Sequence, residues 1–97
     1  MYARATTIRV GADLGEQAEA RYRETLSTFR SIQGNRGAFL LVDRASGTGV
    51  GVTLWESEQA MADSRAQADE LRRRAAEEAR GEIESVDEYE VVVWDVS

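Results

Sequence analysis

The chain of 97 residues contains no cysteine, no histidine and no proline. Without cysteine and histidine it has no disulfide framework, no thiol nucleophile and no Cys/His zinc site. A heme iron held by a proximal histidine or cysteine is excluded as well. The sequence also shows no EF-hand spacing of carboxylates, no GxGxxG motif and no P-loop. We therefore predict no metal site and no bound cofactor, and the sequence assigns no catalytic residue.

Long apolar runs are also missing. None approaches the roughly 20 residues that span a bilayer, and the first residues lack the apolar stretch of a signal peptide. The net charge is −6, with 18 acidic against 12 basic residues, which disfavours nucleic acid and anionic membranes as partners. We predict a cytoplasmic protein that binds neither.

One local exception to the acidic balance is a group of arginines near the end of the predicted second helix. Its members are Arg72, Arg73, Arg74 and Arg80. They alternate with glutamates, and pairs such as Glu70–Arg74 and Arg73–Glu77 lie four residues apart. This spacing favours a solvated helix face with ion pairs over a nucleic-acid patch.

The order of predicted elements is β-α-β-β-α-β in one domain over residues 1–97. Residues that favour strands predict strands over 2–10, 38–43, 49–56 and within 85–96. Apolar spacing and end signals predict helices over 16–31 and from an N-cap at Ser57 to about Arg80, with Gly81 as the stop. Residues 11–15 form a loop and residues 44–47 a turn, in which Gly47 takes a positive φ. This order is that of a ferredoxin-like α+β fold with an antiparallel sheet.

Two predicted strands are apolar on both faces. In residues 38–42, Phe39 and Leu41 face one side, while Leu40 and its neighbours face the other. The run over residues 91–96 (VVVWDV) has the same property. Such strands are buried on both faces, but two helices cover only one face of a four-stranded sheet. We therefore predict a homodimer in which two sheets meet face to face as a dimeric α/β barrel.

The chain resembles the antibiotic-biosynthesis-monooxygenase (ABM) group of the dimeric α/β-barrel superfamily. The resemblance rests on the hairpin AFLLVDRASGTGVGVTLWES, the Ala- and Arg-rich helix after it, and the closing VDEYEVVVW. Its most specific part is a strand ending in LWES that runs directly into a helix. The resemblance implies a homodimeric barrel with a pocket in each subunit between the sheet and the helices.

The resemblance also separates two enzymatic branches. The heme-degrading branch uses an Asn on the first strand and a Trp and a His on the second helix, and none of these occurs at those places here. The quinone-forming branch uses Asn, Trp, Tyr and Arg as pocket groups. This chain offers Asn35, which the sequence places in a loop, so its match to that branch is loose.

Four residues are candidates for ligand binding. Tyr22, Phe39 and Trp55 are large aromatic side chains on elements that converge in this fold. The third strand leaves space beside them at Gly49 and Gly51. Arg4 is the candidate for a pocket side chain that faces an anion. The competing interpretation is that Arg4 forms an ion pair at the surface or at the rim of the dimer. For each aromatic residue, a place in the hydrophobic core is the competing interpretation.

Two functional hypotheses stay open at this point. The first is a small dimeric protein that binds a planar aromatic molecule without catalysis. The alternative is a cofactor-independent monooxygenase that oxidises an aromatic, quinone-forming substrate in a dry pocket. The absent motif residues favour binding without catalysis.

Overall fold

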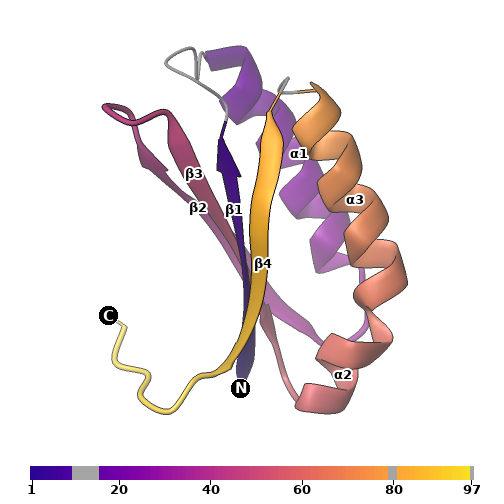
Figure 1. Ribbon diagram of the computed structural model, residues 1–97. Coiled ribbons are helices and arrows are strands. Elements are labelled where there is room, and N and C mark those ends of the chain that lie inside the picture. The colour runs from indigo at the N-terminus through magenta and orange to yellow at the C-terminus, as the bar shows by residue number, and fades with distance from the viewer. Residues whose placement is uncertain (10–15, 79–80, 97) are drawn as a thin grey trace.

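The computed structural model describes residues 1–9, 16–78 and 81–96. Four strands form one antiparallel sheet in the order β2-β3-β1-β4. All the described helices lie on one face of it (Figure 1). The strands are β1 (Tyr2–Arg9), β2 (Asn35–Asp43), β3 (Thr48–Trp55) and β4 (Glu82–Glu90), and the helices are α1 (Glu16–Arg30), α2 (Glu58–Asp63) and α3 (Arg65–Glu78). The predicted ferredoxin-like α+β order is confirmed.

The predicted turn between β2 and β3 is also confirmed. Gly47 has a φ of 73°, which glycine adopts without steric penalty. Its N–H donates to the carbonyl of Asp43 at 3.0 Å, and the Asp43 carboxylate accepts from the N–H of Ala45. The predicted loop over residues 11–15 and the predicted helix end at Arg80 lie outside the described residues. At the start of β4, the N–H of Gly81 donates to the carbonyl of Ala76 at 2.8 Å, a closure typical of a helix end.

The second predicted helix is divided in two at Ser64, which the sequence analysis missed. Ser57 caps α2 as expected, and its side chain accepts from the N–H of Ala60. Ser64 donates its hydroxyl to the carbonyl of Met61 at 2.7 Å. The Arg4 side chain also donates to that carbonyl. Side-chain donors that compete for helix carbonyls interrupt or bend a helix, and here they separate α2 from α3.

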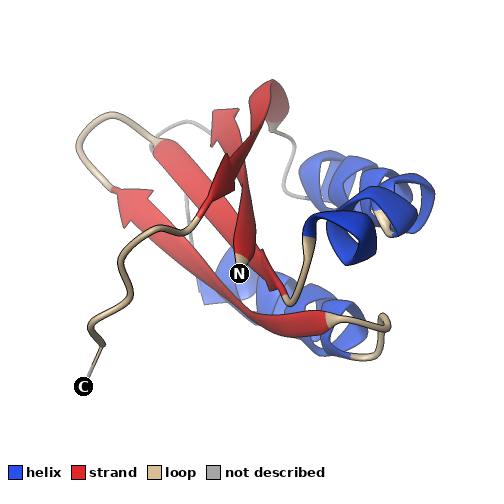
Figure 2. Ribbon diagram, turned by 90° about the horizontal axis from the view of Figure 1, so that it is seen from below, coloured by secondary structure: helices blue, strands red, loops and turns tan. Residues whose placement is uncertain are grey.

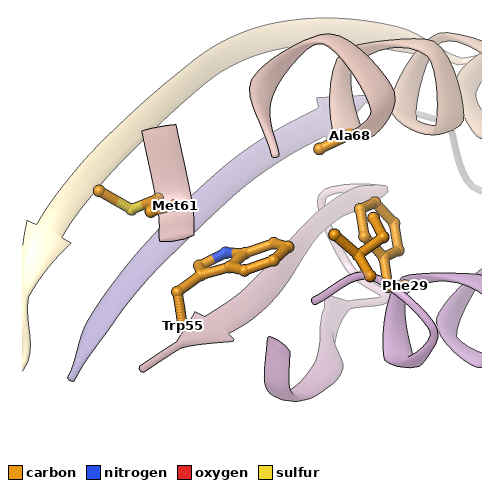
Figure 3. Close-up of a cluster of buried hydrophobic side chains, with 5 residues drawn as sticks. Phe29, Trp55, Met61 and Ala68 are labelled. Atoms are coloured by element: carbon orange, nitrogen blue, oxygen red, sulfur yellow. The ribbon is translucent and has the colours of Figure 1, made fainter. Parts of the chain in front are cut away.

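The hydrophobic core lies between the helices and the inner face of the sheet. Trp55 is fully buried at the end of β3, and Phe29 of α1 lies close to it with 2% of its surface exposed. Ala68 of α3 has no exposed surface, so its small side chain lets α3 approach the sheet closely. Figure 3 shows this cluster, whose members are Phe29, Ile32, Trp55, Met61 and Ala68.

The last strand ends earlier than the sequence predicts. β4 covers Glu82–Glu90, so the prediction that the strand lies within residues 85–96 is wrong for the apolar run 91–96. Val91 still donates its N–H to the carbonyl of Met1, but the residues after it leave the sheet. They extend on the side away from the helices (Figure 2). Most of this run is exposed: Val92 and Val93 at 80%, Val96 at 67% and Trp94 at 53%.

The outer face of the sheet has no helix over it among the described residues (Figures 1 and 2). The register between β2 and β3 places Leu41 opposite Val50 and Phe39 opposite Val52 on this face. Leu41 is 55% exposed, and Tyr89 of β4 is 56% exposed. This open apolar face is the one that the sequence analysis assigns to a partner. None of the described helices has the length and apolar character needed to cross a membrane.

Candidate functional site

Arg4 is buried at the centre of the inner face, with 1% of its surface exposed. Its guanidinium donates to the carbonyl of Met61 at 2.8 Å and to the hydroxyl of Ser64 at 3.3 Å. It also forms an ion pair with Glu88 at 2.9 Å and lies 5.7 Å from the ring centroid of Trp55. Arg4 is therefore held on several sides by β4, by the helix break and by an aromatic face.

Glu88 joins Arg4 to a second arginine at the edge of the site. Its carboxylate accepts from Arg65 of α3 at 2.6 Å as well as from Arg4. These hydrogen bonds, first that from Arg65 and then that from Arg4, hold the pKa of Glu88 below its usual range, while partial burial opposes them. The Glu88 carboxylate is thus already occupied by two cations.

We expect Glu88→Gln to lower the free energy of unfolding at pH 7 by about 1–3 kcal/mol, because Arg4 would keep its charge without a carboxylate. The lowered pKa means that this carboxylate stabilises the fold fully above its ordinary pKa of 4.5. The contribution is lost as the pH falls through the lower pKa of the folded state. Urea unfolding of both proteins at pH 7 and pH 3 measures this, and the difference between them should be smaller at pH 3.

Glu70→Gln is the matched control for that experiment. Glu70 also has a lowered pKa, caused first by its hydrogen bond from Arg73, but this pair is exposed. Exposed pairs contribute little, so the control should change stability much less than Glu88→Gln does. Equal losses in the two variants at pH 7 would contradict the structural role of Glu88.

Arg72 corrects one sequence-based prediction. Arg73 and Arg74 are exposed and pair with Glu70 and Glu77, as predicted. Arg72 is not on that solvated face: only 9% of its surface is exposed. It lies four residues after the buried Ala68, so the helical spacing alone would have placed it inward.

The Arg72 guanidinium is only partly paired. One nitrogen forms an ion pair with the exposed carboxylate of Asp69. The other terminal nitrogen, Nη1, is buried, and no described residue hydrogen-bonds to it. Burial and the nearby charge of Arg4 lower the pKa of Arg72 to about 10, so it stays charged at neutral pH. Glu88 and Tyr22 act in the opposite direction but only partly offset this effect.

Tyr22 of α1 faces Arg72 across a small internal cavity. The cavity has a volume of about 10 Å³, roughly the space for one water molecule. Its lining is formed by Thr6, Ile8, Tyr22, Thr25, Phe29, Gly51, Thr53, Arg72 and Ala75. A Cβ atom on Gly51 would overlap the Tyr22 hydroxyl, so the glycine gives this side chain its place against β3. Burial raises the pKa of Tyr22 to about 12, so its hydroxyl is neutral at pH 7.

A larger groove lies on the other side of Tyr22, between α1 and the edge strand β2. Its volume is about 450 Å³, within the range of small-molecule sites. The lining is formed by Glu19, Tyr22, Arg23, Leu26, Ala38, Phe39, Leu40, Val42 and Arg44. Tyr22 lines both spaces, so the groove and the small cavity meet at this side chain.

The structure divides the four predicted site residues into two pairs. Tyr22 and Phe39 both line the groove, and Phe39 lies at its edge because its strand register directs it toward the open face. Arg4 and Trp55 lie together beneath α2, where Trp55 belongs to the core and donates its indole N–H to Thr53 at 3.0 Å. Asn35 is structural as well: it begins β2, and its side chain bonds the backbone of Gly37 and of β3.

The sequence and the fold agree with known proteins. The sequence profile described as antibiotic biosynthesis monooxygenase matches residues 1–75. The chain belongs to the antibiotic biosynthesis monooxygenase family. The uncharacterized proteins Rv2557 and MT2634 of Mycobacterium tuberculosis, from strains H37Rv and CDC 1551, are each 35% identical to it over 92 residues. That alignment covers 94% of this chain but 41% of each relative, so the chain spans about two fifths of their length.

Two solved structures of the antibiotic biosynthesis monooxygenase fold are also similar. The heme-degrader MhuD of Mycobacterium tuberculosis, solved with two hemes in its active site, aligns with a TM-score of 0.71 and 26% identity over the whole of both chains. The cofactor-independent oxygenase SnoaB of Streptomyces nogalater aligns with a TM-score of 0.65 and 17% identity over 96% of this chain and 92% of its own. Members of the family are typically dimers, and some bind planar ligands such as heme.

A heme does not fit the small cavity beside Tyr22 and Arg72, which holds about 10 Å³. The chain also has no histidine or cysteine to act as an axial ligand. The likeness to MhuD therefore supports the shared fold and family, but not the same ligand.

Proposed function

We propose that this chain is a homodimeric binding protein of the antibiotic biosynthesis monooxygenase family that takes a small planar aromatic molecule between its helices and its sheet. We place it in the cytoplasm and treat residues 1–97 as one domain. The observation that carries the proposal is the position of Tyr22, which lines both the groove and the cavity. An outward rotation of this side chain would join the two spaces into one site of a size that suits a fused ring.

The lining of the groove supports an aromatic ligand. Leu26 and Leu40 supply apolar surface, Tyr22 supplies a ring that can stack on a planar molecule, and Phe39 borders the groove at its edge. Charged side chains such as Glu19 and Arg23 also line the groove and make part of its surface polar. An aromatic ring could contact the apolar side chains of the groove, while a polar substituent on that ring is directed past Tyr22.

The dimer is supported by the open apolar face. Leu41, Val50 and Val52 share this face, and the exposed run 91–96 extends on the same side of the sheet. Burying about 600 Å² of apolar surface would contribute about 15 kcal/mol before the costs of association. A second copy of the same face is the simplest partner, because a two-fold interface uses the same residues twice.

Ala38→Leu is expected to weaken binding of 2-naphthol, a planar probe that is neutral at pH 7. Ala38 lines the groove, and three added carbon atoms there would occupy the space of the ring. We expect saturable binding to the unaltered chain by calorimetry and an affinity loss of roughly tenfold in the variant, about 1.4 kcal/mol.

Ala66→Leu provides the matched control, because Ala66 is exposed on α3 and lies outside the groove lining. It should leave the affinity for 2-naphthol unchanged. Absence of saturable binding to the unaltered chain would overturn the proposed function. Equal losses in both variants would place the ligand somewhere other than the groove.

The alternative function, a cofactor-independent monooxygenase, is favoured by one feature of the same interior. A charged arginine, Arg72, and a neutral hydroxyl, Tyr22, face one small enclosed space, where they would stabilise the anion of a hydroxylated substrate. A phenol that loses its proton and reacts with one dioxygen gives a quinone, and the second oxygen atom leaves as water when the proton returns to it. Oxygen consumption with 1-naphthol, with quinone formed in equal amount, distinguishes this enzyme from a protein that only binds.

A further inference from the structure

We propose that the ligand of this interior site carries an anionic oxygen, a carboxylate or an ionised hydroxyl, on its aromatic ring, and that Arg72 binds it through Nη1. This inference rests on the proposed function above and names the chemical class of its ligand. Arg72 plays no part in the core cluster, so its burial needs a separate explanation.

The first argument is the charge balance of the interior. Two guanidinium groups, those of Arg4 and Arg72, are buried there, each with at most 9% of its surface exposed. The Glu88 carboxylate already accepts hydrogen bonds from Arg4 and Arg65. Asp69 reaches Arg72 only from the solvent side, with 64% of its side chain exposed. The interior therefore holds more buried positive than negative charge, and buried charges are normally paired.

The second argument is geometric. Nη1 of Arg72 is buried without a partner among the described residues, and Arg72 lines the cavity that meets the groove at Tyr22. A single water molecule in that cavity would accept a hydrogen bond from Nη1 but would not balance its charge. An anionic oxygen would do both, as guanidinium–carboxylate pairs do elsewhere in proteins.

The lining of the cavity beside Arg72 suits an oxygen acceptor. The hydroxyl-bearing side chains Thr6, Thr53 and Tyr22 line the same cavity, and each can donate a hydrogen bond. Tyr22 keeps its proton at neutral pH because its pKa is about 12. A carboxylate that enters past Tyr22 would thus meet one cation and neutral hydroxyl donors, while the attached ring stays beside Leu26 and Leu40 in the groove.

A pair of probes with the same ring tests this inference. We expect 2-naphthoate to bind the full chain at pH 7 at least roughly tenfold more tightly than 2-naphthamide, which has nearly the same shape but no charge. In Arg72→Met this preference should fall to less than about threefold, and Arg72→Lys should keep part of it. Arg73→Met, at the exposed neighbour on the same helix, should leave it unchanged. The ionised form of 2-naphthol absorbs at longer wavelength, so a spectrum of its complex shows whether an ionised hydroxyl also occupies the site.

Each other outcome has a distinct meaning. Saturable binding of both probes with equal affinity would overturn the anion inference and leave the proposed function standing. Binding of neither probe would overturn both. A preference that survives in Arg72→Met would show that another group holds the anion. If Arg72→Met does not fold, two other measurements decide the question. The preference should be reduced in Arg72→Lys, and 2-naphthoate should raise the unfolding midpoint of the unaltered chain more than 2-naphthamide does. An undiminished preference in Arg72→Lys together with equal rises would overturn the inference.

Discussion

Trp55→Ala is expected to lower the free energy of unfolding by about 3–5 kcal/mol, among the largest losses that one substitution in this chain should cause. Trp55 is fully buried and packs with Phe29, Met61 and Ala68 from three helices. Its removal would leave a cavity at the point where these helices meet the sheet. It would also remove the aromatic face beneath the Arg4 guanidinium. Urea unfolding followed by far-ultraviolet circular dichroism, at one fixed protein concentration, measures the loss.

Trp55→Phe is the matched control, because it keeps a ring in the same place and should lose less than half as much stability. The affinity of folded Trp55→Ala for 2-naphthol shows whether Trp55 belongs to the hydrophobic core or to the ligand site. Since Trp55 does not line the groove, we expect that affinity to change little. A large loss of affinity with nearly unchanged stability would instead make Trp55 a ligand-binding residue.

The fold was predictable because its signals are local and agree with one another. The glycine turn at Gly47, the N-cap at Ser57 and the apolar spacing of the helices each define one element without reference to the others. The break at Ser64 was not predictable in this way. It depends on Arg4, sixty residues away in the chain, whose side chain reaches the carbonyl of Met61.

The last strand shows a second limit of sequence patterns. Residues 91–96 favour strand structure, but a strand also needs a neighbour, and β1 pairs with β4 only as far as Glu90. An apolar run beyond the reach of its own sheet therefore leaves it and stays exposed. Composition predicts the tendency of such a run, whereas its pairing depends on the length of the strand beside it.

The candidate site was predictable only in part. Tyr22 and Phe39 were found because aromatic residues on converging elements are conspicuous. Arg72 was missed because it stands in a run of arginines that mostly faces solvent. The charge pattern correctly predicted that Arg73 and Arg74 are exposed to solvent, but it wrongly predicted the same for Arg72. The helical position of Arg72 relative to Ala68 carried the information, since side chains four apart share a face.

Leu41→Lys is expected to convert the proposed dimer into a monomer or to weaken it at least roughly 100-fold. Leu41 lies on the open face of β2 with 55% of its surface exposed, opposite Val50 of β3. In the proposed dimer this position meets the second sheet, and a two-fold interface would bury the new charge twice. A buried charge without a partner costs several kcal/mol, and each 1.4 kcal/mol corresponds to about tenfold in affinity. Sedimentation velocity at micromolar concentration measures the change.

The neighbouring residue and an exposed helix position make this experiment specific. Leu40 points to the groove side of the same strand, so Leu40→Lys should reduce 2-naphthol binding while leaving the oligomeric state unchanged. Ala66→Lys adds the same charge on the exposed side of α3 and should change neither property. A monomer in the unaltered chain would remove the proposed dimer outright. A dimer that persists in Leu41→Lys would mean that the two copies meet elsewhere. The apolar run 91–96 would then be the next segment to truncate, because it is also exposed and extends on this side of the sheet.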